Sequence, residues 1–356
     1  MATAFTFEAV ADNVAAGGDG GIGLAVDRAG NPNIAFLQPG NGQIVVARRN
    51  GGTWTHKNAQ GAFVSFESRP CIAIDSQGNP HLAYKNLSSG ELVHTFKSGA
   101  QWSSTVIRTR LDPQHQPGGI ANVALALHPG RTDPASRDAA YFVYVDLGSD
   151  GIGFAHTGAG RTPTTVQMDP NHMTTFSGPS AVFDPSENFF VAYVGIFETG
   201  SPQDSILIRT AHLTDNIQSA FSTPLVVDGS RSINVRRATS IARTSGSACI
   251  AYFDSASKTL KAAINLSGIA GIEPIATNIN TFVTPSAAAA RFGDFRVAYA
   301  DVDAVKLASR GQLPDWTVET VDAVSAGPVS LAYDSSGTAH IAYVAGGKVK
   351  YARRSE

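Results

Sequence analysis

The chain repeats one short phrase of turn-forming and hydrophobic residues along its length. The phrase reads DRAGNPNIAF at 27–36, DSQGNPHLAY at 75–84 and DSSGTAHIAY at 334–343. An aromatic residue closes each copy, and aligning on that residue gives seven units, at Phe36, Tyr84, Tyr144, Tyr193, Tyr252, Tyr299 and Tyr343. Successive units lie 44 to 60 residues apart, a spacing typical of propeller blades.

Each unit has the pattern of four short strands. In the second unit we expect strands at 70–75, 80–86, 91–97 and 101–107, divided by turns rich in Gly, Ser and Asn. Ala, Val, Ile and aromatic residues fill these strands, and no stretch has the periodicity of an amphipathic helix. The sequence therefore predicts an all-β fold.

The last unit has only three expected strands, at 327–334, 339–345 and 348–354. The leading segment 4–12 is strand-like and belongs to no other unit, so we expect it to complete the last blade and close the ring, which protects exposed edges. The prediction is a single domain, a seven-bladed β-propeller of four-stranded blades, over 1–356. The expected blades are about 20–60, 66–108, 119–168, 176–228, 235–277, 283–322 and 326–354.

A tryptophan element follows the phrase in three units, as GGTW (51–54), SGAQW (98–102) and LPDW (313–316). With the phrase itself, these elements resemble the BNR/sialidase-like propeller repeats, with degenerate Asp boxes. That superfamily includes sialidases, polysaccharide lyases, lectins and fungal hetero-Diels–Alderases, which close rings without a cofactor. The resemblance therefore implies an architecture and does not choose among these functions.

Composition excludes several classes of partner. A net charge of −2 with scattered Arg-Arg pairs gives no footprint for nucleic acid. The longest apolar run, 189–197, is far short of the ~20 residues that span a bilayer.

The chain as given lacks the features of a signal peptide, so we expect a cytoplasmic protein or a secreted one whose signal is removed. Cys71 and Cys249 lie in apolar runs and are expected to be buried free thiols; no motif indicates an oligomeric state.

The repeated polar residues are expected to be structural. Asp27, Asp75, Asp184 and Asp334 close a first strand and open a turn, where aspartate typically accepts backbone hydrogen bonds. His81 and His340 start the second strand beside the same turn. The repeated tyrosine is replaced by Phe36 in one unit, which favours packing over proton transfer.

Residues that do not repeat are better candidates for a site, because a bound ligand breaks the symmetry of the blades. They gather in the segments that lead into the first strands, which we expect on one face of the disc. The candidates there are Phe66, Glu67, Arg69, His115, Asn122, His172, Met173, Phe176, Arg236, Arg237 and Phe282. Lys85 directly follows a second-strand aromatic residue and joins them.

These residue types suggest roles. Arg69 and Arg237 would hold a carboxylate, carbonyl or phenolate, and His115 or His172 would transfer a proton. Phe66, Met173, Phe176 and Phe282 would form the apolar walls of a pocket. Polar contacts to the substrate would come from Glu67, Lys85, Asn122 and Arg236. The two histidines would need a third ligand to hold zinc, and none lies nearby in sequence, so we expect no metal. No glycine pattern of the nucleotide-binding kind follows a strand and opens a helix, so we expect no organic cofactor either.

The favoured function is a cofactor-independent enzyme with one central pocket, of lyase or cyclase type. Elimination on an acidic sugar and pericyclic ring closure of a biosynthetic intermediate both fit these groups. The alternative is a carbohydrate-binding propeller lectin, which would repeat its sites blade by blade. A propeller that only binds other proteins is a third possibility. In each of the first two cases the partner is a small molecule or a glycan.

Overall fold

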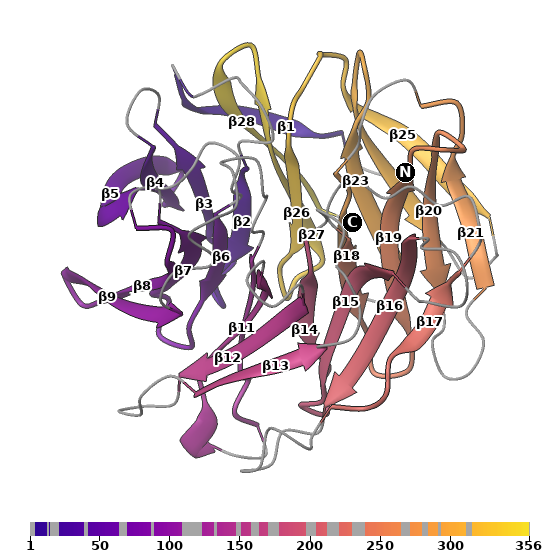
Figure 1. Cartoon of the computed structure of the whole chain (residues 1–356). Helices are drawn as coiled ribbons and strands as arrows, with labels where there is room; N and C mark the ends of the chain where they lie inside the picture. Colours follow the sequence, from indigo (N-terminus) through magenta and orange to yellow (C-terminus); the bar gives the residue numbers. More distant parts are fainter. Residues whose placement is uncertain are drawn as a thin grey trace. The chain divides into compact units, whose positions relative to one another are not determined.

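The computed structural model of this chain describes residues 4–12, 14, 21–38, 42–63, 70–86, 89–108, 123–131, 134–146, 151–157, 164–169, 178–196, 204–211, 221–229, 239–264, 271–279, 284–290, 293–310 and 315–355. These residues form seven four-stranded antiparallel sheets, drawn in Figure 1. The only helical segment among them is the short 3-10 helix η1 (Pro134–Ser136). In the described part of the chain, no helix is long and apolar enough to cross a membrane.

The chain divides into two compact units, and each is described by itself. The first unit comprises Met1–Arg110 and Ala288–Glu356. Its first two sheets follow the sequence order: β2 (Gly23–Val26), β3 (Pro32–Leu37), β4 (Gln43–Asn50) and β5 (Thr53–Phe63); then β6 (Cys71–Ile74), β7 (Pro80–Lys85), β8 (Leu92–Ser98) and β9 (Gln101–Arg108). The strands of the second sheet match the predicted ones to within one residue at each end.

Two further sheets belong mainly to the first unit. One contains β22 (Ser286–Ala289), β23 (Phe295–Ala300), β24 (Val305–Arg310) and β25 (Trp316–Asp322). The other contains β26 (Val329–Tyr333), β27 (Thr338–Ala345), β28 (Lys348–Ser355) and, as its fourth strand, β1 (Thr6–Ala11). β1 pairs antiparallel with β28, with Thr6 opposite Arg353, so this sheet contains strands from both ends of the chain.

The second unit, Leu111–Ala287, contains three sheets. They are built from β10 (Val123–Leu127), β11 (Ala140–Asp146), β12 (Gly151–Thr157) and β13 (Thr164–Asp169); β14 (Ser180–Phe183), β15 (Phe189–Ile196), β16 (Asp204–Ala211) and β17 (Leu225–Asp228); and β18 (Ser240–Arg243), β19 (Ala248–Asp254), β20 (Thr259–Ile264) and β21 (Gly271–Ala276). All seven sheets thus have the same strand order.

The second strand of each sheet is the most buried. Every residue of β3 and of β19 is buried. Both faces of β3 contact neighbouring sheets, since Ile34 packs in a cluster with Val344 and Leu37 packs in a cluster with Leu82. The repeated aromatic residue of this strand packs against the preceding sheet: Tyr84 joins Leu37 and Val46 in one core cluster, and Tyr252 joins Val194 in another. Its predicted packing role is therefore confirmed. Burying such a side chain contributes about 1.5–3 kcal/mol.

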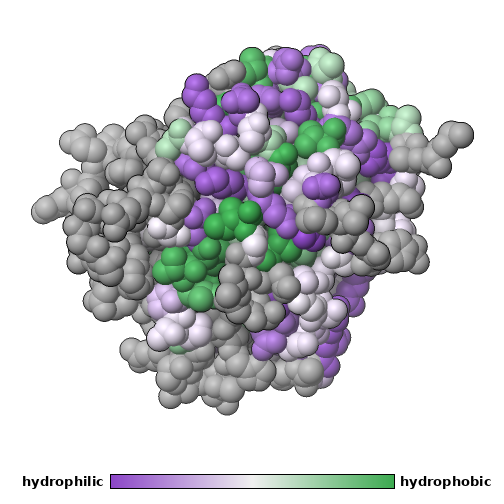
Figure 2. All heavy atoms as spheres, turned by 90° about the vertical axis from the view of Figure 1, so that its right-hand side faces the viewer, coloured by the Kyte–Doolittle hydropathy of each residue, from purple (hydrophilic) through white to green (hydrophobic). Residues whose placement is uncertain are grey.

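The fourth strands are the most exposed. The large hydrophobic side chains that reach solvent lie mostly there: Phe7, Val106, Leu225, Val226, Ile272 and Val318. Figure 2 shows hydrophobic residues gathered on the face drawn there, with hydrophilic residues around them. Trp54, Trp102 and Trp316 all lie at the beginning of fourth strands.

The two cysteines form no disulfide, and only Cys249 is buried. The expectation of two buried thiols is therefore wrong for Cys71. This residue begins β6, a first strand whose four residues are all half-buried. Apolar neighbours in sequence do not distinguish this less covered strand from the second strand of a sheet.

Candidate functional site

Each sheet has two ends that differ in chemistry. The turn end carries the tight turn between the first and second strands, such as 27–31 or 75–79. The loop end is the opposite one, where the second and fourth strands finish. The sequence repeat is centred on the turn end.

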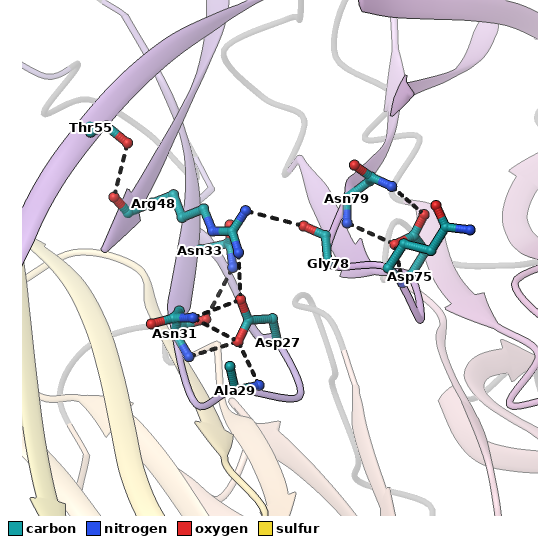
Figure 3. A network of polar contacts seen from close by, with 10 residues as sticks. Asp27, Ala29, Asn31, Asn33, Arg48, Thr55, Asp75, Gly78 and Asn79 are labelled. Atoms are coloured by element: carbon teal, nitrogen blue, oxygen red, sulfur yellow. Dashed lines mark hydrogen bonds and ion pairs between the residues drawn. The ribbon is translucent and has the colours of Figure 1, made fainter. Parts of the chain in front are cut away.

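At the turn end, Asp27 accepts hydrogen bonds from the backbone nitrogens of Ala29 and Asn31, each at 2.9 Å, and from the Asn31 side chain (Figure 3). Burial alone would raise the pKa of Asp27, but these bonds and one from Arg48 outweigh it, so the pKa is lowered. The Arg48 guanidinium lies 2.8 Å from Asp27 and also donates to the carbonyl oxygen of Gly78 in the next sheet, at 3.5 Å.

The other three turn aspartates repeat this arrangement. The Oδ1 atoms of Asp75, Asp184 and Asp334 each accept from the backbone nitrogens two and four residues later, at 2.7 to 2.9 Å. The predicted turn role is therefore confirmed for all four. A carboxylate whose oxygens are already occupied by its own turn is a poor candidate for an acid or base.

The turn-end histidines are likewise held by the scaffold. His340 contacts the Tyr351 hydroxyl at 2.6 Å and Asp334 at 3.2 Å. The rings of His81 and His94 contact each other at 3.0 Å between Nδ1 and Nε2, and both stack near Phe96. Burial, with the neighbouring His81, lowers the pKa of His94 to about 3. Both predicted structural histidines are thus buried in polar contacts.

The loop end of sheet β18–β21 holds a different group, which we call the loop-end cluster: Asp228, Tyr252, Asp254, Ser257 and Lys261. The Tyr252 hydroxyl donates to Asp228 Oδ2 at 2.5 Å. Lys261 Nζ donates to Asp254 Oδ2 at 2.9 Å and lies 3.8 Å from Asp228 Oδ2. Ser257 donates to Asp254 at 2.6 Å. One ammonium therefore links two carboxylates from neighbouring repeats.

Most of this cluster is buried. Asp228 and Asp254 are 3% and 1% exposed, and the Lys261 side chain is 19% exposed. Burial, the hydrogen bond to Asp228 and the nearby carboxylate charges all raise the pKa of Tyr252. Tyr252 is therefore a neutral hydrogen-bond donor at ordinary pH. Of Lys261, Asp228 and Asp254, Lys261 has the most exposed side chain.

The same three residue types recur at equivalent positions of the sheet that contains both chain ends. The Tyr343 hydroxyl donates to Asp322 Oδ2 at 2.6 Å, and Lys350 Nζ donates to the same oxygen at 3.2 Å. The register repeats as well, with Tyr252 opposite Lys261 and Tyr343 opposite Lys350. In the sheet between these two in sequence, Tyr299 lies opposite Lys306, which pairs instead with Asp301 at 2.7 Å.

Of the residues predicted for the site, the structure describes Lys85, which is half-buried at the end of β7 and thus at a loop end. The others lie outside the described residues: Phe66, Glu67, Arg69, His115, Asn122, His172, Met173, Phe176, Arg236, Arg237 and Phe282. Their segments, 64–69, 109–122, 170–177, 230–238 and 280–283, each connect a fourth strand to the first strand of the next sheet. Both ends of each segment are therefore attached to the loop end of a sheet.

The loop-end partners of the tyrosines are not predicted by the sequence repeat. Asp228 and Asp322 end fourth strands and lie 24 and 21 residues before the tyrosines they bind. A signal exists in the sequence: a lysine follows Tyr252, Tyr299 and Tyr343 after seven to nine residues. Among the residues described, no group of three or more His, Cys, Asp or Glu side chains is arranged to hold a metal ion.

Comparison with known proteins identifies the fold and nothing finer. No family model matches the chain, and no curated protein matches it by sequence. A polysaccharide lyase described as an ulvan lyase is similar in structure, with a TM-score of 0.61 at 12% identity, covering 96% of this chain and 94% of that one. Virginiamycin B lyase from Staphylococcus aureus gives 0.55 at 12% identity, covering 99% of both chains.

AofleA from Arthrobotrys oligospora gives a TM-score of 0.54 at 10% identity, covering 90% of this chain and 91% of that one. At these identities the likeness concerns architecture. Together with the repeated four-stranded sheets and the near absence of helix, it supports an all-β propeller fold.

Proposed function

We propose that this chain is a single seven-bladed propeller domain, closed by β1, and an enzyme of lyase or cyclase type that uses no organic cofactor. The observation that carries the proposal is the loop-end cluster. Two carboxylates with exposures of 3% or less, a tyrosine and a lysine are gathered at the loop end of sheet β18–β21. Burying charge is costly, so such groups concentrate where chemistry or binding needs them.

The cluster also lies beside a segment with candidate substrate-binding residues. Asp228 ends β17, and the segment 230–238, with Arg236 and Arg237, begins two residues later. In our proposal Arg237 binds an anionic oxygen of the substrate, and Arg69 in the segment 64–69 serves the same purpose. The loop-end cluster is a positioning element rather than the catalytic group, because Tyr252 is fully buried.

Proton transfer is assigned to His115 or His172, as the sequence analysis expects. In an elimination on an acidic sugar, the imidazole removes the proton from the carbon beside the carboxylate. The bond between the neighbouring carbon and the leaving oxygen then breaks, a carbon–carbon double bond forms, and the leaving oxygen takes up a proton. In a ring closure, the same groups hold the substrate in a reactive geometry and share hydrogen bonds with it.

Phe66, Met173, Phe176 and Phe282 are proposed as apolar walls, and Glu67, Lys85, Asn122 and Arg236 as polar contacts of a small-molecule or glycan substrate. The similar ulvan lyase is known in a structure bound to -[GlcA(1-4)Rha3S]-. Acidic polysaccharides are therefore the first substrates to test.

The test measures turnover of a panel of polyuronates, sulfated and unsulfated, through the absorbance of the unsaturated product. If the proposal is right, Arg69→Ala, His115→Ala, His172→Ala and Arg237→Ala variants include at least one with turnover reduced about 100-fold or more. Lys348→Ala, at an exposed ion pair, is the control and should remain fully active. Unchanged turnover in all four variants would remove the proposed site.

A second candidate function, a carbohydrate-binding lectin, is favoured by one observation. The Tyr–Lys–Asp arrangement recurs at equivalent positions of two sheets, and the side chains of Lys350 and Asp322 are 33% and 20% exposed. Propeller lectins present similar sites repeatedly. Calorimetry that finds several equivalent sugar sites per chain, with no turnover, would favour the lectin over the enzyme.

A further inference from the structure

The first two sheets, β2–β5 and β6–β9, pack on each other through apolar residues. Val46 and Ala59 on one sheet contact a core that includes Leu82, Tyr84 and Val93 on the other. Because side chains alternate along a strand, residues two positions from these project from the same faces. The polar residues at those positions therefore border the same interface between sheets.

Three cations occupy such positions towards the turn end; we call them the basic cluster: Arg48, Lys57 and Lys97. Arg48 is two residues beyond Val46 on β4, and Lys57 is paired opposite Val46 on β5. Lys97 is four residues beyond Val93 on β8 and is paired opposite Trp102, which packs against the shared core. The Arg48 guanidinium already crosses this interface to Gly78, as Figure 3 shows.

The positive charge of this cluster is only partly neutralised. Arg48 is paired with Asp27 at 2.8 Å, whereas neither Lys57 nor Lys97 makes an ion pair with a residue that the structure describes. Burial and the charges of Lys57 and Arg48 lower the pKa of Lys97. Like charges brought together without acidic partners destabilise a fold, and an anion bound among them removes that cost.

We propose that the basic cluster is a binding site for a tetrahedral oxyanion, a sulfate or phosphate group. The two ammonium groups offer donors on either side of the interface, and the guanidinium adds a third cation held in place by Asp27. The Trp102 ring beside Lys97 offers an apolar surface for the carbon skeleton that bears the group. This site is at the turn end and is independent of the proposed active site.

The test uses isothermal calorimetry with inorganic sulfate, at constant ionic strength and pH 7. One sulfate should bind per chain, Lys57→Gln and Lys97→Gln should each weaken binding about tenfold or more, and the double variant should abolish it. Lys258→Gln, at an exposed turn of another sheet, is the matched control and should bind as the wild type does. Titrations with phosphate monoesters and with a sulfated oligosaccharide show which kind of molecule carries the bound group. The one that binds more tightly identifies the class of the natural ligand.

A second measurement is the pKa of Lys97, followed by NMR of 13C-methylated lysines. Added sulfate should raise it, and so should Lys57→Gln. The proposal is overturned if sulfate binding is absent or unsaturable, or if the double variant binds as the wild type does. The Arg237→Ala variant should keep full sulfate affinity, so failure of this site and failure of the proposed active site can be told apart.

Discussion

The two ends of the sheets hold their carboxylates in different ways. At the turn end, Asp75 is bound by Gln77 and Asn79, two and four residues away. At the loop end, Asp228 is bound by Tyr252, 24 residues further on in the next repeat. The Asp75 carboxylate is therefore satisfied within its own turn, whereas the contact between Asp228 and Tyr252 forms only when neighbouring repeats have packed. This difference predicts different responses to mutation and pH.

The largest effect is expected from Asp254→Ala. Asp254 is 1% exposed and accepts from both Lys261 and Ser257, so its loss leaves a largely buried ammonium without its nearest partner. The free energy of unfolding should fall by about 3–5 kcal/mol, measured by urea denaturation. Asp301→Ala is the comparison, because both partners of the Asp301–Lys306 pair are more exposed, and its cost should be clearly smaller. Equal costs would show that burial at the loop end is not the deciding factor.

A smaller effect is expected from Asp75→Ala at the turn end. The variant loses hydrogen bonds from the Gln77 and Asn79 backbone nitrogens, at 2.9 and 2.7 Å, but these nitrogens lie in a turn that water can reach. The free energy of unfolding should fall by about 2 kcal/mol in the same urea experiment. Asp75→Asn, which keeps an acceptor oxygen, should recover part of the loss. A cost above that of Asp254→Ala would reverse the comparison.

The turn aspartates and the loop-end tyrosines should also respond to opposite extremes of pH. Asp27 and Asp334 have lowered pKa values, so their contribution is present above the unfolded value of about 4 and is lost as acid protonates them. Tyr252 and Tyr343 have raised pKa values, so their contribution is complete below about pH 10 and is lost as pH rises further. The alkaline loss should approach about 1.4 kcal/mol per pH unit for each tyrosine.

Tyr343→Phe tests this difference, since it should flatten the alkaline fall and leave the acid side unchanged. Unfolding free energies measured between pH 3 and 11.5 give both limbs from one series. An alkaline limb that is the same in wild type and variant would contradict the assignment to the tyrosine.

The smallest effect is expected from Lys348→Ala. Lys348 pairs with Asp12 at 2.9 Å, but the two side chains are 54% and 66% exposed. Water and salt screen such a pair, so the melting temperature should change by no more than about 2 °C. Asp12 follows the fourth strand β1 and so lies at a loop end. A larger change would show that exposure does not determine how much a loop-end ion pair contributes to stability.

The sequence repeat predicts most of the fold because it is centred on the second strand and its turn. The turn role of Asp184 and the packing of Tyr193 follow from that register alone. The partner of Tyr252 could not be predicted in the same way. It lies at the end of a fourth strand, where the repeats diverge: Asp228 and Asp322 occupy two such ends, and Ala276 occupies the corresponding end between them. The loop segments also diverge between repeats. The sequence therefore indicates which chemical groups they carry, but not which residues those groups contact.

The pairing of β1 with β28 affects the order of folding. The Thr6 hydroxyl donates to the carbonyl oxygen of Arg353, 347 residues further along the chain. On the ribosome, β1 is made first but cannot find its neighbour until the last repeat has been synthesised. Contacts this distant in sequence slow folding, and an unpaired strand can associate with other chains while it waits. The pairing of β1 with β28 completes the last sheet to form. It is thus also the folding step with which aggregation competes most.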